Sequence, residues 1–129
     1  MNAKQYSAGE LAYFGDAVLE LLTRRHLLTL SLGQIGAINK EAKKYVQATA
    51  QSEAVEKILP LLSEEELAAF KRGRNNHTSA TPKSASACEY RRATGFEALF
   101  GYLWLSGETA RAEELFAIAY GIGEAKADT

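Results

Sequence analysis

Apolar residues recur every three or four positions along most of the chain, which is the spacing of one face of an α-helix. The first such stretch runs from residue 7 to about residue 30. Ser7, with Glu10 three residues later, has the pattern of a capping box and predicts the start of a helix there. Strict alternation of apolar and polar residues, which is typical of a half-buried strand, is nearly absent.

Two further stretches have the same helical spacing. One runs from about residue 34 to residue 59, is ended by Pro60, and is long enough that we expect a bend or break near residues 49–52. The next begins at Ser63, where three acidic residues follow a residue type that favours the N-cap, and extends to about residue 74. The spacing of apolar residues therefore predicts three helical segments in the first half of the chain.

A polar stretch of twelve residues, 75–86, interrupts the helical pattern and contains Pro82. Loops of this length in small domains are often functional. A very apolar helix is predicted over residues 87–105, a last helix from residue 108 to about residue 120, and a frayed tail over residues 121–129. We expect an all-α fold, a helical bundle of five to seven helices.

Length and composition limit the class of protein. The 129 residues predict a single domain over residues 1–129, and 47% apolar with 24% charged residues is an ordinary globular balance. Disordered, collagen-like and coiled-coil classes are excluded by this composition. Cys88 is the only cysteine, so we expect no internal disulfide and a reducing compartment. No signal peptide or membrane span is visible, and we expect a cytoplasmic protein.

The formal net charge of −1 hides an uneven distribution. Residues 71–92 hold six basic residues against Glu89 alone, a net charge of +5. Such a segment indicates either a polyanionic partner or a solvated basic surface. Its cations are Lys71, Arg72, Arg74, Lys83, Arg91 and Arg92. A second, weaker group is formed by Lys40, Lys43 and Lys44.

Acidic residues occur inside two apolar helical stretches. Asp16 and Glu20 are one helical turn apart in the first helix, and Glu97 lies in the most apolar helix of the chain. Burying an unpaired carboxylate is costly, so these acids need a partner. If they converge, their oxygens would suit Mg²⁺. The alternative is that each acid pairs with an arginine or lysine, or that Glu20 points to solvent.

Three motifs, in order along the chain, resemble those of the ribonuclease III family. LAYFGDAVLE (residues 11–20) resembles the signature of ribonuclease III catalytic domains, and FEALFGYLWL (residues 96–105) resembles their second acidic motif. RGRNNHTSATPK (residues 72–83) followed by YRRATGFEAL (residues 90–99) is similar to Mini-ribonuclease III, the short form with a catalytic domain and no double-stranded RNA-binding domain. The resemblance covers nearly the whole chain.

The resemblance implies an Mg²⁺-dependent endoribonuclease that cleaves double-stranded RNA. Asp16 and Glu97 fall on catalytic metal-site positions of the family, and Glu20 is a candidate metal ligand. The implied substrate is precursor ribosomal RNA of the large subunit (23S), with the basic residues of 71–92 contacting its phosphates. A homodimer is implied, with Tyr13 packing across its interface, and a large-subunit ribosomal protein is a further candidate partner.

The chain departs from full-length ribonuclease III at three acidic positions, where it has Gly9, Ala12 and Thr94. The number of metal ions and the remaining ligands therefore stay open. Two alternatives also stay open. One is a non-catalytic helical RNA-binding module of ribosome assembly, and the other is a helical adaptor that binds a protein through an apolar face.

Overall fold

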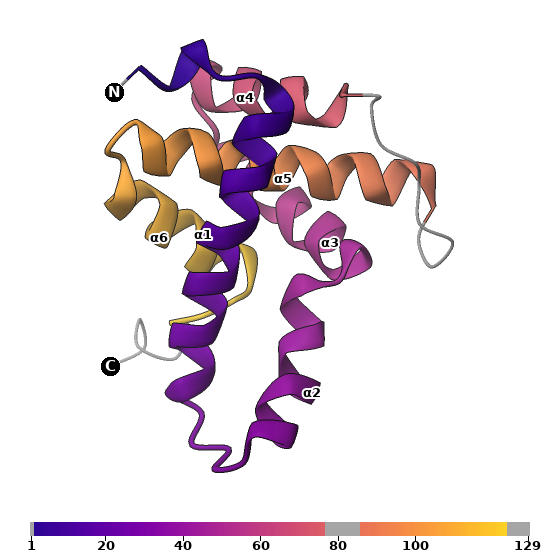
Figure 1. Ribbon diagram of the computed structural model, residues 1–129, viewed down its shortest axis with the longest axis vertical. Coiled ribbons are helices and arrows are strands. Elements are labelled where there is room, and N and C mark those ends of the chain that lie inside the picture. Colours follow the sequence, from indigo (N-terminus) through magenta and orange to yellow (C-terminus); the bar gives the residue numbers. More distant parts are fainter. Residues whose placement is uncertain (1, 77–85, 124–129) are drawn as a thin grey trace.

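A computed structural model of the chain describes residues 2–76 and 86–123 (Figure 1). Within these residues every regular element is a helix, so the predicted all-α class is confirmed, and six α-helices fall within the predicted number. The elements are η1 (Ala3–Gln5), α1 (Ala8–Leu28), α2 (Ile35–Val46), α3 (Ala48–Ile58), η2 (Leu59–Leu61), α4 (Glu64–Arg74), α5 (Ala87–Leu105) and α6 (Thr109–Ala119), where η denotes a 3₁₀ turn. None of the helices in the described ranges is long and apolar enough to cross a bilayer.

Capping boxes start three of the helices. At α1 the Ser7 hydroxyl accepts a hydrogen bond from the Glu10 N–H (3.1 Å), and the Glu10 carboxylate accepts one from the Ser7 N–H (2.8 Å). The same reciprocal bonds start α4 at Ser63 and Glu66 and start α5 at Ser86 and Glu89. Each pair satisfies two backbone donors that a helix start would otherwise leave unpaired. The predicted starts at residues 7 and 63 are confirmed.

The long helical stretch of residues 34–59 is broken at Gln47, two residues before the predicted region. Gln47 has an extended backbone (φ −69°, ψ 147°). Its N–H donates to the Lys43 carbonyl and closes α2, while its own carbonyl accepts from the Gln51 N–H and opens α3. One residue therefore caps both helices, and α3 can turn its apolar side into the core while α2 stays outside.

The chain after α6 begins with a turn rather than a frayed end. The Ile122 N–H donates to the Ala117 carbonyl (2.8 Å), and the Ile122 side chain packs against the core. Gly121, with a φ of 66°, provides the left-handed conformation that this helix end requires. Residues 121–123 of the predicted tail thus form a hydrogen-bonded turn, and residues 124–129 lie outside the described residues.

Helix α5 is the centre of the fold. It lies across the molecule with α1 in front of it and α4 along one side (Figure 1), and it contacts α1, α3, α4 and α6. Phe96, Leu99, Phe100 and Leu103 of this helix are fully buried. Phe96 and Phe100 pack edge to face with ring centroids 4.9 Å apart. The buried residues of α5 lie between Ala93 and Leu103, and their burial explains why this part of the helix is so apolar.

Two glycines let the backbones of α1 and α5 touch. A Cβ atom on Gly15 would overlap the carbonyl oxygen of Glu97, and a Cβ atom on Gly101 would overlap the carbonyl oxygen of Leu11. No side chain other than hydrogen fits at either position without separating the helices. This crossing fixes the relative position of the residues next to it, including Asp16 and Glu97.

An ion pair ties α4 to α6. The guanidinium of Arg111 donates from Nε to one carboxylate oxygen of Glu66 (2.9 Å) and from Nη2 to the other (3.0 Å). Arg111 also donates to the Leu61 carbonyl (2.9 Å). Glu66 is buried, and its hydrogen bonds to Arg111 hold the pKa of this carboxyl below its usual range. The pair is therefore structural and lies outside the crossing of α1 and α5.

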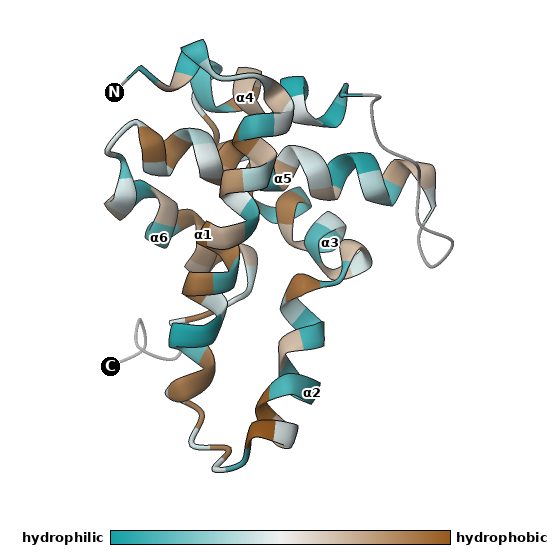
Figure 2. Ribbon diagram, in the orientation of Figure 1, coloured by the Kyte–Doolittle hydropathy of each residue, from teal (hydrophilic) through white to brown (hydrophobic). Residues whose placement is uncertain are grey.

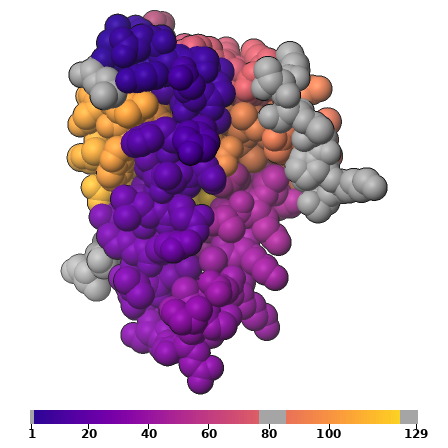
Figure 3. Space-filling model, in the orientation of Figure 1, coloured from indigo at the N-terminus to yellow at the C-terminus, as the bar shows by residue number. Residues whose placement is uncertain are grey.

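The end of α1 and the whole of α2 extend away from the remaining helices. They form a lobe of their own at the bottom of Figure 3, and none of the α2 residues is buried. Leu28 and Ile35 are 73% and 71% exposed, and apolar segments colour both helices in this lobe (Figure 2). The helical spacing of α2 was predicted correctly, but its apolar side is only partly covered in the single chain.

Candidate active site

The crossing of α1 and α5 brings two acidic side chains together. Asp16 follows Gly15 on α1, and Glu97 lies on α5 at the point where the two backbones touch. Their carboxyl groups lie within hydrogen-bonding reach of one another. Two residues 81 positions apart in the sequence thus meet at one place, as the resemblance implies for the catalytic pair.

The environment of Glu97 strongly favours its protonated form. The residue is half-buried, and this burial together with the negative charge and the hydrogen bond of Asp16 raises the pKa of Glu97 to about 8. Near neutral pH Glu97 therefore holds its proton, because a second negative charge beside Asp16 would be unfavourable in this half-buried place. A divalent cation at this place would replace the proton and remove the repulsion.

Asp16 is exposed, although it lies within an apolar run. The apolar run covers two sides of α1, of which one packs on α5 and the other faces solvent. The solvent side carries Tyr13, Phe14 and Leu21, which are all exposed. Asp16 is therefore exposed in the single chain although it lies in an apolar run, because the surrounding apolar residues do not all belong to the core.

Neither carboxylate has a basic partner among the described residues. In the ranges 2–76 and 86–123, no ion pair involves Asp16 or Glu97. The same ranges hold no group of three or more acidic, histidine or cysteine side chains that could bind a metal. A site of two carboxylates fits Mg²⁺, which binds through one or two carboxylates and keeps several waters. The alternative in which each acid pairs with a cation does not apply to these two residues.

Glu20 is not brought into this pair. Its carboxylate accepts hydrogen bonds from Nε (3.0 Å) and Nη2 (2.8 Å) of Arg24, which lies one turn further along α1. Thr94, one of the positions where an acid is missing, donates its hydroxyl hydrogen to the Tyr90 carbonyl (2.9 Å). The described site therefore consists of Asp16 and Glu97, with Glu20 held nearby in a surface ion pair.

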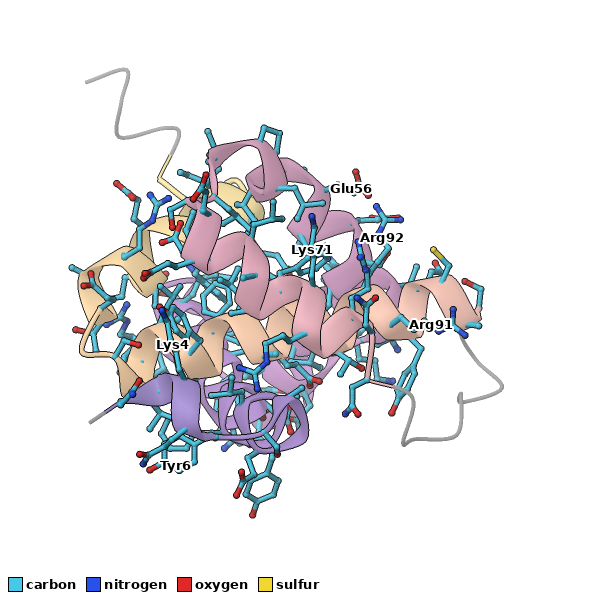
Figure 4. The ribbon with its side chains drawn as sticks, turned by 90° about the horizontal axis from the view of Figure 1, so that it is seen from above. Lys4, Tyr6, Glu56, Lys71, Arg91 and Arg92 are labelled. Carbon is cyan, nitrogen blue, oxygen red and sulfur yellow. The ribbon has the colours of Figure 1, made fainter. Side chains whose placement is uncertain are left out.

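The predicted cations divide into two groups. Lys71 and Arg91 are exposed and take part in no ion pair of the described residues (Figure 4). Arg72, Arg74 and Arg92 are engaged by other parts of the fold. Lys83 lies outside the described residues. The basic surface predicted from residues 71–92 therefore exists on α4 and α5, with only part of its charge unengaged.

The three engaged arginines each have a specific contact. Arg72 donates to the Tyr6 carbonyl (2.9 Å), and Arg74 lies over the ring of Phe70, with its guanidinium carbon 5.8 Å from the ring centroid. Arg92 forms an ion pair with Glu56 of α3. Figure 4 shows these two side chains directed toward one another. Glu56 thus belongs to the basic surface, and nothing in its local sequence indicates this, because the pairing joins distant helices.

A profile of the Ribonuclease III domain matches residues 9–108. The chain is 43% identical to the Mini-ribonuclease 3 of Thermoanaerobacter sp. over 114 residues, 88% of this chain and 80% of that protein. It is 42% identical to the Mini-ribonuclease 3 of Symbiobacterium thermophilum over 109 residues, 84% of each chain. The family profile spans both acidic motifs and the basic segment between them.

A solved structure agrees with this similarity. The crystal structure of a protein from Fusobacterium nucleatum superimposes with a TM-score of 0.80 at 35% identity, over 90% of this chain and 93% of that one. The helical fold, the meeting of Asp16 with Glu97 and the sequence matches agree with one another. The chain belongs to the ribonuclease III family, in its Mini-ribonuclease 3 group, and is an endoribonuclease.

Proposed function

We propose that this endoribonuclease cleaves double-stranded segments of large-subunit (23S) ribosomal RNA precursor, with Mg²⁺ held by Asp16 and Glu97. The adjacency of these two carboxyl groups, without a basic partner in the described residues, is the observation that carries the proposal. Hard carboxylate oxygens are the ligands that Mg²⁺ prefers, and double-stranded RNA is the substrate of the family.

When bound, Mg²⁺ supplies charge stabilisation at the phosphodiester and lowers the pKa of water. The protein's own contribution is to position the two carboxyl groups and to provide their negative charge. Gly15 and Gly101 fix the spacing of the two helices, so Asp16 and Glu97 need no rearrangement to act together. Glu97 must lose its proton before it can bind the cation, and Asp16 stays open to solvent, where a phosphate can reach it.

Glu20 is a candidate third oxygen donor in this proposal. It lies one helical turn beyond Asp16, but Arg24 holds its carboxylate in a hydrogen-bonded ion pair. Its recruitment to the metal therefore requires that this pair opens. Surface ion pairs of this kind contribute only about 0–1 kcal/mol, so opening it is a small cost.

The basic surface on α4 and α5 is the proposed contact for RNA phosphates. Lys71 and Arg91 are exposed, and Arg72 keeps its positive charge while it donates to a backbone carbonyl. Arg74 and Arg92 belong to the same surface, and Lys83 completes the proposed set. A-form RNA is recognised through its phosphates and 2′-hydroxyls, so these contacts would give binding that weakens steeply with salt.

The proposed active form is a homodimer, which would give one active site for each RNA strand. Its support is the apolar outer side of α1, where Tyr13 is 84% and Leu21 53% exposed. Exposed apolar patches of this kind mark association surfaces. Asp16 lies on the same helix between these residues. We place the reaction in the cytoplasm, where precursor ribosomal RNA is present, with a large-subunit ribosomal protein as a candidate partner that presents the substrate.

The test is to map the 5′ ends of large-subunit ribosomal RNA precursor after incubation with the protein and Mg²⁺. We expect new ends on both strands of a duplex segment, with none formed in EDTA or by Asp16→Asn. New ends formed by Asp16→Asn would contradict the assignment of the site. If the wild-type protein binds the precursor and produces no ends, the chain acts as a non-catalytic RNA-binding module and the proposal is wrong.

A further inference from the structure

A pocket lies apart from the carboxylate pair, between α3, α4 and α5. Its volume is about 490 Å³, which lies within the range of about 300–1,000 Å³ that is typical of small-ligand pockets. Its polar lining includes Glu56, Arg74, Asn75, Arg91 and Arg92. Neither Asp16 nor Glu97 contributes to it, so it is separate from the site described above.

The guanidinium of Arg74 has two contacts at this pocket. It lies over the ring of Phe70, which is itself buried beneath it, at 5.8 Å from the centroid. Its Nε donates to the side-chain oxygen of Asn75 (3.2 Å). The guanidinium of Arg74 is planar and cationic, and it lines the pocket. Such a group stacks well with a nucleobase.

The charge of the pocket favours an anion. Three guanidinium groups, those of Arg74, Arg91 and Arg92, face one carboxylate, that of Glu56. Arg92 and Glu56 form an ion pair across the pocket wall, while Arg91 is exposed (Figure 4). Guanidinium groups are the preferred partners of phosphate. Glu56 adds an acceptor that can take a hydrogen bond from an amino group of a base.

The pocket is close to the carboxylate pair along α5. Arg92 and Glu97 are five residues apart on this helix, a rise of about 7.5 Å along its axis. Arg92 is directed toward α3, whereas Glu97 meets α1. One RNA molecule that contacts the carboxylate pair can therefore reach around α5 into the pocket. Bases within a duplex are stacked and paired, so only an unpaired nucleotide can enter.

We propose that this pocket binds a single unpaired nucleotide, with its base stacked on Arg74 and its phosphate contacted by Arg91 and Arg92. The source of the nucleotide in the RNA substrate rests on the proposed function, and a free nucleotide has the same chemistry. The pocket then gives the enzyme a preference for duplexes that carry an unpaired nucleotide beside the cleaved segment.

The test measures RNA binding in EDTA, where no cleavage occurs, by fluorescence anisotropy. The probes are a fully paired RNA duplex and the same duplex with one bulged adenosine, and adenosine 5′-monophosphate serves as a competitor. The ratio of the two duplex affinities is the readout, because phosphate contacts common to both duplexes cancel. We expect the wild-type protein to bind the bulged duplex about tenfold more tightly, as one stacked base provides.

Arg74→Lys keeps the charge but removes the flat guanidinium, so it should bring the ratio close to one. Lys57→Ala is the matched control: it removes an exposed cation of α3 that does not line the pocket, and it should leave the ratio unchanged. Circular dichroism confirms that both variants fold. The proposal is overturned if the ratio survives Arg74→Lys, or if the wild-type protein shows neither the preference nor binding of the monophosphate.

The monophosphate separates the two sources of the nucleotide. If it reduces binding of the bulged duplex to that of the paired one, the RNA nucleotide and the free nucleotide share the pocket. If it binds in an Arg74-dependent manner while the ratio is one, the pocket takes free nucleotides. Both results support the site, and neither depends on cleavage, so a failure of the proposed function would be seen independently.

Discussion

The carbonyl oxygen of Glu97 occupies the space in which a side chain at Gly15 would begin. The backbone of Glu97 is therefore in direct contact with the backbone of Gly15, the residue before Asp16. Since Asp16 is the next residue, the separation of the two carboxyl groups depends on how closely α1 approaches α5. The separation of the two carboxyl groups therefore depends on residue 15 having no side chain.

Gly15→Ala should abolish cleavage and destabilise the fold. The added methyl group would force α1 away from α5, which costs about 1–3 kcal/mol in overpacked cores and more where backbone atoms collide. Thermal unfolding and cleavage of duplex RNA measure both effects. Gly36→Ala in α2 is the control, because nothing lies within 4 Å of that position, and it should stabilise the protein by up to about 1 kcal/mol. Normal cleavage by Gly15→Ala would contradict the account.

The pH dependence of stability should reveal the raised pKa of Glu97. Between its ordinary value of 4.5 and about 8, the folded protein binds the proton more strongly than the unfolded chain does. The free energy of unfolding without metal should therefore fall as pH rises through this window. Glu97→Gln should lose this component. Thermal unfolding in EDTA at several pH values measures the difference between the two proteins, and parallel curves would contradict the assigned shift.

Binding of Mg²⁺ should show the opposite dependence on pH. Because Glu97 must release its proton to bind the cation, the affinity for Mg²⁺ should rise with pH up to about 8. Isothermal titration in two buffers of different ionisation enthalpy would detect the released proton. Binding that is independent of pH between 6 and about 8 would exclude Glu97 as a ligand.

Arg111→Ala should destabilise the protein by about 2–4 kcal/mol, since it leaves the buried carboxylate of Glu66 without its partner. The lowered pKa of Glu66 adds stability above pH 4.5 that is lost as pH falls through the lowered value. Chemical denaturation at pH 7 measures the loss. Lys44→Ala, which breaks the exposed pair with Glu41, should change stability by less than about 1 kcal/mol. Equal losses of stability in Arg111→Ala and Lys44→Ala would contradict this prediction.

Leu21→Glu should convert the proposed dimer to a monomer without unfolding it. The side chain is 53% exposed in the single chain, so a charge costs little there, whereas it would be buried at the proposed interface. Sedimentation velocity measures the oligomeric state. Leu61→Glu, at a position 49% exposed on η2, is the matched control and should stay dimeric. A wild-type protein that sediments as a monomer would rule out the dimer.

Much of the fold was predictable because its signals are local. The capping pairs at Ser7 and Ser63 specify the starts of α1 and α4 within a few residues of sequence. The break at Gln47 was predicted only approximately, since no proline or glycine marks it and the turn is needed for tertiary packing. The partly exposed apolar side of α2 was not predictable, because periodicity shows that a side is apolar and not what covers it.

The two acidic residues of the site could be predicted because they lie in sequence motifs that resemble those of a known family. Asp16 and Glu97 were both expected in it, and the structure brings them together. The exposure of Asp16 could not be derived from an apolar run that serves two sides of one helix. The ion pair of Glu56 with Arg92 could not be derived either, because it joins residues far apart in the chain.

The most direct test of the central claim compares cleavage of duplex RNA by Asp16→Asn, Glu97→Gln and the double variant at saturating Mg²⁺. If the two carboxylates act as one unit, each single variant should lose about a hundredfold or more in rate, and the double variant should lose little beyond that. Circular dichroism establishes that all three proteins are folded. Retained cleavage by either single variant, or losses that multiply in the double variant, would contradict the account.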